Sequence, residues 1–203
     1  MPPRSRSRSR NDRHPRDQLK EAGTRLFFDK GFHGTTVRDI TEACGLTPGA
    51  LYNHFGSKEE VLRAIILDGH AELDNRLAAV PAGPAPERLR RLLEVFVLHH
   101  ARFRREAMVG DEWKALEPKA RKEVRAKRLA LRESFESTIR AGVEAGEFVV
   151  PKVDGGDPVR LATMALLDMG FRTCSWFRPK SGVVDAEFAR FYADLALATL
   201  LKQ

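Results

Sequence analysis

Residues 35–58 predict two short helices around a tight turn, and this stretch constrains the fold more than any other part of the chain. Thr36 is a good N-cap for the first helix, and Asp39, three residues later, is the acidic partner of a capping box. Gly45 lies where a helix end favours positive φ, after which Thr47 can cap a second helix with Pro48 at its first position. The apolar residues that face inward are Val37, Ile40, Ala43 and Cys44 on the first helix and Leu51 and Phe55 on the second.

Two short helices joined in this way describe a helix-turn-helix, in which the second helix enters the major groove of DNA. The spacing alone leaves a plain helical hairpin inside a core as the alternative. The exposed face of the second helix is small or polar enough to approach base edges, and its residues are Thr47, Pro48, Gly49, Ala50 and Asn53. Thr and Ala methyl groups can contact a thymine methyl, and the Asn53 amide can pair with adenine.

The same stretch closely resembles the DNA-binding domain of the TetR family of one-component transcription regulators. The matching segments are GFHGTTV at 31–37, GLTPG at 45–49, LYNHF at 51–55 and SKE at 57–59. Cys44 stands where the family usually has Ala, which exchanges one small residue for another. The resemblance implies that a helix starting near residue 59 connects the DNA-binding domain to the rest of the chain. It also implies dimerisation through a four-helix bundle.

Four further residues are predicted to contact DNA phosphates, namely Thr36, Tyr52, His54 and Lys58. Phosphate contacts position a protein on the duplex without reading its sequence. Tyr52 is the strongest candidate, since its hydroxyl would have no partner in a core, whereas His54 is as easily a partly buried core histidine. Lys58 lies at a helix N-terminus, where the helix dipole and the ammonium both favour a phosphate.

The net charge of +7 is concentrated at the N-terminus. Residues 1–16 carry six Arg against one Asp, whereas residues 17–58 carry five basic and five acidic side chains. We therefore expect residues 1–16 to be a disordered basic arm that follows phosphates or enters the minor groove. A solubilising tail is the alternative.

The sequence predicts an all-α fold of about nine helices, with a helix-turn-helix domain at 17–60 and a ligand-binding and dimerisation domain at 61–203. The last two helices, near 158–177 and 185–201, carry more apolar surface than one face can bury, which indicates a homodimer. A twofold dimer sets two recognition helices roughly 34 Å apart, so the operator is expected to be palindromic. No apolar run approaches the ~20 residues that span a bilayer, so we expect a cytoplasmic protein with no membrane partner.

No catalytic motif is present, and we expect neither an enzyme nor a cofactor or metal. His99 and His100, with Asp111 and Glu112 nearby, do not suit a metal because adjacent helical side chains point about 100° apart. The predicted effector-binding residues are polar or aromatic groups on apolar helix faces: Phe96, His100, Phe103, Trp113, Met164, Asp168, Arg172 and Trp176. Each is also a plausible core residue, and Asp168 is the expected partner of Arg172 four residues later.

The segments 142–148 and 172–179 resemble TetR regulators of fatty-acid and steroid breakdown, which implies an acyl-CoA thioester as effector. The function expected is a repressor that a small hydrophobic effector releases from double-stranded DNA. Two alternatives remain open, a hydrophobic-drug sensor that controls an efflux gene and a helical interaction protein without DNA function.

Overall fold

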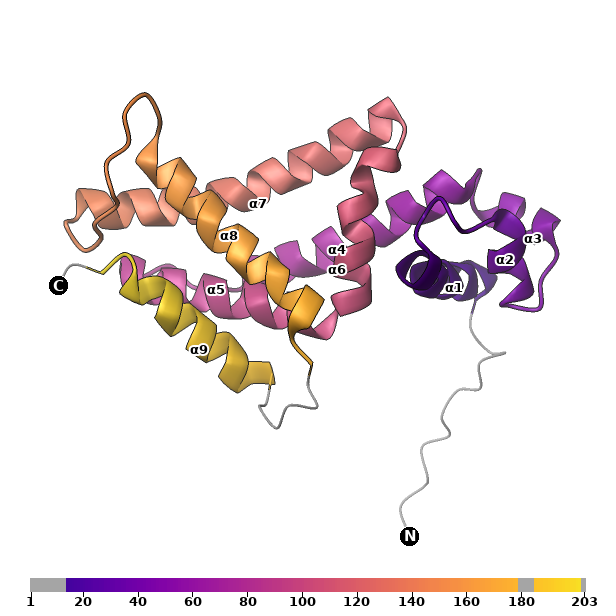
Figure 1. Ribbon diagram of the computed structural model, residues 1–203, viewed down its shortest axis with the longest axis horizontal. Coiled ribbons are helices and arrows are strands. Elements are labelled where there is room, and N and C mark those ends of the chain that lie inside the picture. Colours follow the sequence, from indigo (N-terminus) through magenta and orange to yellow (C-terminus); the bar gives the residue numbers. More distant parts are fainter. Residues whose placement is uncertain (1–13, 179–184, 202–203) are drawn as a thin grey trace, which may run out of the picture.

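The computed structural model describes residues 14–178 and 185–201, and Figure 1 shows their arrangement. These residues form nine α-helices and one short 3₁₀ helix, with no β-strand among them, which confirms the all-α prediction. The elements are α1 (Pro15–Lys30), α2 (Val37–Glu42), α3 (Pro48–His54), α4 (Lys58–Ala78), α5 (Ala85–Arg102), α6 (Arg104–Gly110), η2 (Asp111–Ala115), α7 (Pro118–Glu144), α8 (Pro158–Trp176) and α9 (Asp185–Ala198). No helix among the described residues is long and apolar enough to cross a membrane.

Capping side chains mark the start of four helices, α1, α2, α4 and α8. The Thr36–Asp39 capping box at the start of α2 is confirmed, and Asp157 caps α8 by accepting from the amides of Val159 and Arg160. The predicted side-chain cap of Thr47 is wrong, because that side chain makes no capping hydrogen bond in α3. The first helix, α1, begins at Pro15 with His14 as its N-cap, two residues before the predicted start of the helix-turn-helix domain at residue 17. The predicted arm therefore lies outside the described residues except for its last three positions.

Two apolar clusters form the interior. The first joins α1, α2, α3 and the start of α4 around Leu19, Ile40 and Leu51, and it also takes in Val109 of α6 and Val124 of α7. The predicted boundary near residue 60 falls inside this cluster. The side chains are packed continuously across this boundary. The boundary therefore stays a prediction of where the DNA-binding part of the chain ends and the effector-binding part begins.

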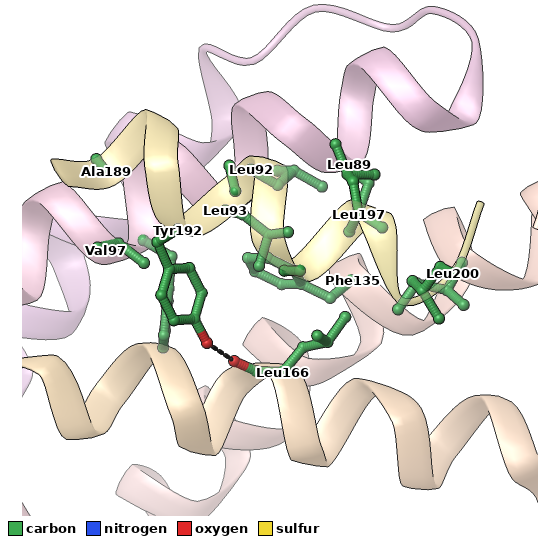
Figure 2. Close-up of a cluster of buried hydrophobic side chains, with 14 of the residues drawn as sticks. Leu89, Leu92, Leu93, Val97, Phe135, Leu166, Ala189, Tyr192, Leu197 and Leu200 are labelled. Carbon is green, nitrogen blue, oxygen red and sulfur yellow. Dashed lines mark hydrogen bonds between the residues drawn. The ribbon is translucent and has the colours of Figure 1, made fainter. Parts of the chain in front are cut away.

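The second cluster lies between α5, α7, α8 and α9, and Figure 2 shows its centre. The Phe96 ring of α5 meets the Phe135 ring of α7 edge to face at 5.7 Å, while the Tyr192 hydroxyl on α9 donates to the Leu166 carbonyl on α8 at 2.9 Å. Burial raises the pKa of Tyr192, so that hydroxyl stays protonated and remains a donor. These contacts fix α8 and α9 against the same core.

The helices α4 and α6 connect the two clusters. Figure 1 shows α1–α3 at one end of the molecule, α4 running from them into the larger helical group, and α6 standing between the two parts. Ion pairs join α7 to α4, with Arg63 bound to Glu123 at 2.7 Å and Lys127 bound to Asp74 at 2.9 Å. Part of the charge on α7 therefore holds α7 against α4.

Candidate DNA-binding surface and effector cavity

The two helices and the turn are built as predicted, except that Ala43, expected to face inward, is the exposed C-cap of α2. Gly45 adopts φ 70°, and the amide of Leu46 donates to the carbonyl of Thr41 at 2.9 Å, which closes the turn after α2. Leu51 and Phe55 are buried against the first cluster, so the opposite face of α3 is left outside. Of the residues predicted to read bases, Thr47, Pro48, Gly49 and Asn53 are exposed and Ala50 is half-buried.

The residues predicted to contact phosphates differ in their availability. Tyr52 is 58% exposed, which leaves its hydroxyl open to a partner outside the chain. The hydroxyl of Thr36 is already engaged by the Asp39 carboxylate at 2.6 Å. This bond and a second one, donated by the Thr36 amide at 2.8 Å, hold the pKa of Asp39 down at about 2. His54 is half-buried, and its ring meets the ring of His14 edge to face at 5.3 Å, which ties α3 to the start of α1.

Lys58 has a different role from the predicted one. Its ammonium donates to the carbonyls of Phe32 at 2.9 Å and Thr35 at 2.8 Å, and it lies 4.2 Å from the centre of the Phe32 ring. The side chain therefore points into the loop before α2 and fixes that loop, instead of reaching outward to a phosphate. Sequence spacing could not reveal this, because the carbonyls lie 23 and 26 positions earlier in the chain.

Replacing Lys58 with methionine is expected to lower the free energy of unfolding by about 2 kcal/mol, because two carbonyls lose a charged donor. Urea unfolding of the full chain measures the change. The matched control is Lys30→Met, whose exposed ion pair with Asp39 at 3.4 Å should be worth under ~1 kcal/mol. Equal losses in the two variants would contradict the role assigned to Lys58.

A cavity of about 280 Å³, here called the core cavity, opens between α4, α5, α6, α7 and α8. Its apolar wall is formed by Ile65, Ile66, Leu73, Phe96, Leu131, Leu167 and Phe171. Its polar groups are His70, His99, His100, Glu106, Asp111, Arg128, Arg132, Asp168 and Arg172. An apolar wall with a few polar groups is the usual form of a small-molecule site.

Five of the eight residues predicted to bind the effector line this cavity, namely Phe96, His100, Met164, Asp168 and Arg172. The structure does not bring the other three to it. Phe103 lies beyond His99, and Trp113 packs beneath the Arg128 guanidinium at 5.3 Å. Trp176 is 60% exposed at the end of α8.

The predicted ion pair between Asp168 and Arg172 is wrong. Both side chains are exposed, and no ion pair joins them in the part of the chain that the structure describes. Helical spacing put them on one face of α8, but that face opens to the outside, so Arg172 needs no partner within the chain.

Sequence reasoning missed six polar residues of the cavity. Two of them, Glu106 and Asp111, lie on α6 and η2, and the other four are His70, His99, Arg128 and Arg132. These four come from three different helices, so only the packing of α4, α5 and α7 brings them together. Nδ1 of His70 and Nδ1 of His99 are buried without a hydrogen-bond partner, whereas Nε of Arg132 lies 3.5 Å from the Glu136 carboxylate in an ion pair. An unpartnered buried polar atom costs roughly 1–3 kcal/mol, which a bound ligand with matching groups would recover.

The cavity histidines are neutral at pH 7. Burial lowers the pKa of His99 to about 4, helped by the charge of Arg76, and burial lowers the pKa of His100 to about 3. Nδ1 of His100 lies 2.7 Å from the carbonyl of Phe96 and is therefore the protonated ring nitrogen that donates to it.

Acid is expected to destabilise the fold through these histidines. Between pH 6.5 and pH 4 the unfolded chain binds protons that buried His99 and His100 do not, so stability falls as the pH falls through this window. His99 alone corresponds to about 3 kcal/mol at the lower end. Urea unfolding at stepped pH measures the slope, and His99→Phe should flatten it. An unchanged slope in that variant would contradict the assignment.

Large apolar side chains lie on the outer faces of the last two helices. On α8 they are Leu161, Met164, Met169 and Trp176, and on α9 they are Phe191 and Leu195. The ring of Trp176 meets that of Phe188 edge to face at 5.4 Å, so the end of α8 packs against the start of α9. Exposed apolar side chains of this size on neighbouring helices are typical of a protein–protein interface.

A helix-turn-helix joined through α4 and α6 to a cavity-bearing helical domain defines the class of one-chain, ligand-responsive transcription regulators. Within that class, the chain belongs to the TetR family of bacterial regulatory proteins. Residues 19–65 match the family's DNA-binding domain, described as bacterial regulatory proteins, tetR family. Residues 82–200 match the tetracyclin repressor-like C-terminal domain. The members of this family are regulators and not enzymes.

Known relatives agree with this assignment over almost the whole chain. The HTH-type transcriptional repressor KstR2 of Mycobacterium tuberculosis is 27% identical over 196 residues, which cover 93% of this chain and 94% of the relative. A tetR-family regulatory protein from Rhodococcus RHA1 superposes with a TM-score of 0.82 at 30% identity, covering 92% of this chain and 97% of that chain. AibR, solved in complex with isovaleryl coenzyme A and operator DNA, shares the fold with a TM-score of 0.78 at 22% identity, covering 90% and 97%.

Proposed function

We propose that this protein is a dimeric transcriptional repressor that leaves a palindromic operator when a small hydrophobic effector fills the core cavity. The observation that carries the proposal is the position of α6. Glu106, Ala107 and Gly110 of α6 line the core cavity, while Arg104 at its start lies 4.7 Å from the centre of the Phe28 ring on α1. One helix thus touches both the effector site and the DNA-binding domain.

This arrangement supplies a means of coupling the two sites. A ligand that enters the cavity contacts α6, and a displacement of α6 moves α1, which packs directly against it. An effector that prefers the displaced state shifts the population away from the form that fits the operator. The coupling needs only that difference in affinity between the two states.

DNA contact falls to the exposed side of the helix-turn-helix. We assign base contacts to Thr47, Pro48, Gly49, Ala50 and Asn53, since they form the outer face of α3. Tyr52 is assigned to a phosphate because its hydroxyl is exposed, and His54 is a further phosphate contact at the end of α3. Thr36 would join them by turning its hydroxyl from Asp39 to a phosphate oxygen. In this proposal Lys58 supports the interface by fixing the loop before α2.

An acyl-CoA thioester is the effector class that we propose. The core cavity is about the size of the smallest drug-like sites, so it suits an acyl group rather than a whole CoA molecule. Arg128, Arg132 and Arg172 line the same cavity and provide cations for phosphate oxygens. A hydrophobic-drug sensor is the alternative, and the free acids and CoA thioesters compared below distinguish the two.

The experiment is a gel shift of the purified protein on its own upstream DNA at rising salt, with acyl-CoAs and the matching free acids added in turn. Binding that weakens steeply with salt supports phosphate-driven recognition. Release by a thioester but not by its free acid supports the effector class. An absence of binding at low salt to this DNA and to selected random operators would favour the helical interaction protein instead.

In the same assay, Tyr52→Phe is expected to weaken operator binding roughly tenfold or more, because a dimer loses two phosphate hydrogen bonds of about 1 kcal/mol each. The ring is retained, so the fold should be unaffected. Ser137→Ala, which removes an exposed hydroxyl from α7, is the matched control and should bind normally. Normal binding by Tyr52→Phe would remove Tyr52 from the interface.

A further inference from the structure

A second cavity lies beside the core cavity and reaches the DNA-binding domain. It has a volume of about 490 Å³ and is bounded by α1, α4 and the α5–α6 junction, and we call it the α1 cleft. Its lining includes Lys20, Thr24 and Arg25 of α1, so a molecule in this cleft would touch the first helix directly.

The two cavities share a partition made of side chains. Ile65, Gly69, His99 and Glu106 line both of them. Residues 65 and 69 lie one turn apart on the same face of α4. On one side of them, Ile66, His70 and Leu73 line the core cavity. On the other side, Asp68 and Glu72 line the α1 cleft. The cavities are therefore neighbours around one edge of α4, and the helix body does not separate them.

His99 stands in this partition. Its ring lies 5.4 Å from the ring of His100, which lines the core cavity, and 5.0 Å from the ring of Phe103, which lines the α1 cleft. His99 is only 6% exposed, yet its Nδ1 has no hydrogen-bond partner. Gly69, which lines both cavities as well, has no side chain, and a Cβ added there would meet nothing within 4 Å.

We propose that the core cavity and the α1 cleft form one channel for an elongated, mainly apolar ligand, which passes between His99 and Gly69 and carries a hydrogen-bonding group at His99. This inference rests on the proposed function, in which the core cavity is the effector site. A molecule of this length contacts α1 itself and α6 at the same time. Long effectors would then act on the DNA-binding domain more directly than short ones.

Charge sets the direction in which the ligand lies. The α1 cleft is lined by five carboxylates (Asp17, Glu21, Asp68, Glu72 and Glu106) and three cations (Lys20, Arg25 and Arg105), an excess of two negative charges. A phosphate-bearing end is repelled there and stays beside Arg128 and Arg132 of the core cavity. The far end of the apolar chain is therefore the part that enters the α1 cleft.

Gly69→Leu tests the channel, because leucine fills the open space at the partition and suits a helix. Straight-chain acyl-CoAs from C4 to C16 and the matching carboxylic acids are titrated into the full-length protein by calorimetry, without DNA. In the unmodified protein, affinity should rise about fourfold for each methylene that becomes buried, up to a chain that spans both cavities. Gly69→Leu should bind the short members normally and the long members at least tenfold more weakly.

Gly83→Leu is the control, since it adds the same side chain in open space outside both cavities and should bind the long chains normally. Three results would overturn the channel: long-chain affinity unchanged in Gly69→Leu, equal losses for short and long chains, or no binding of any probe by the unmodified protein. Because the titration contains no DNA, it decides the channel independently. Failure of the proposed function would appear separately, as an unmodified protein that binds no operator or is not released from it.

Discussion

Replacing Phe191 with aspartate is expected to convert the proposed dimer into a folded monomer that binds the operator at least 100-fold more weakly. Phe191 is 63% exposed on α9, and no other helix among the described residues covers it. In a four-helix bundle formed by α8, α9 and their symmetry mates, the new carboxylate would be buried in an apolar interface without a partner, which costs several kcal/mol. The monomer then contacts one half-site only and loses the gain from binding two linked half-sites.

Light scattering measures the mass of the variant, and a gel shift measures its operator affinity. Val153→Asp is the matched control, because Val153 is an exposed apolar residue in the loop before α8 and lies outside the proposed interface. We expect that control to remain dimeric and to bind normally. A Phe191→Asp protein that is still a dimer would show that α9 lies outside the interface.

The helix-turn-helix could be predicted from sequence because its signals are local. Thr36 and Asp39 form a capping box three residues apart, Gly45 supplies the positive φ of the turn, and the buried pair Leu51 and Phe55 is one helical turn apart. Each of these interactions spans four residues or fewer. The sequence pattern therefore contains all the information needed to place α2 and α3.

The effector cavity could be predicted only in part, because its polar wall is assembled from distant segments. His70, His99 and Arg132 share the cavity although 29 or more positions separate each from the next. An apolar helix such as α8 also has two kinds of apolar face, one for the core and one for a partner chain. Periodicity does not separate them, which is why Trp176 was expected at the effector and lies on the outer surface.

Replacing Gly142 with alanine is expected to have the largest effect on stability, a loss of about 3 kcal/mol in the free energy of unfolding. A Cβ at position 142 of α7 would lie 2.2 Å from Cδ2 and 2.9 Å from Cγ of Phe148. The contact with Cγ means that turning the ring about its own axis gives no relief. The main chain of Phe148 is also held, since its amide donates to the Gly142 carbonyl at 3.0 Å and it pairs with Leu201 in an isolated bridge.

The sign of the effect follows from two opposing terms. Alanine in a helix interior is favoured over glycine by up to ~1 kcal/mol, whereas forcing a buried ring out of its site costs 1–3 kcal/mol or more and leaves Phe148 badly packed in the second cluster. Gly69→Ala isolates the first term, because its Cβ meets nothing within 4 Å in α4, and it should raise stability. Urea unfolding of both variants should therefore shift the midpoint in opposite directions. Stabilisation of both variants would mean that the Phe148 ring can move away from α7. The packing of Phe148 against Gly142 would then contribute little to the stability of the domain.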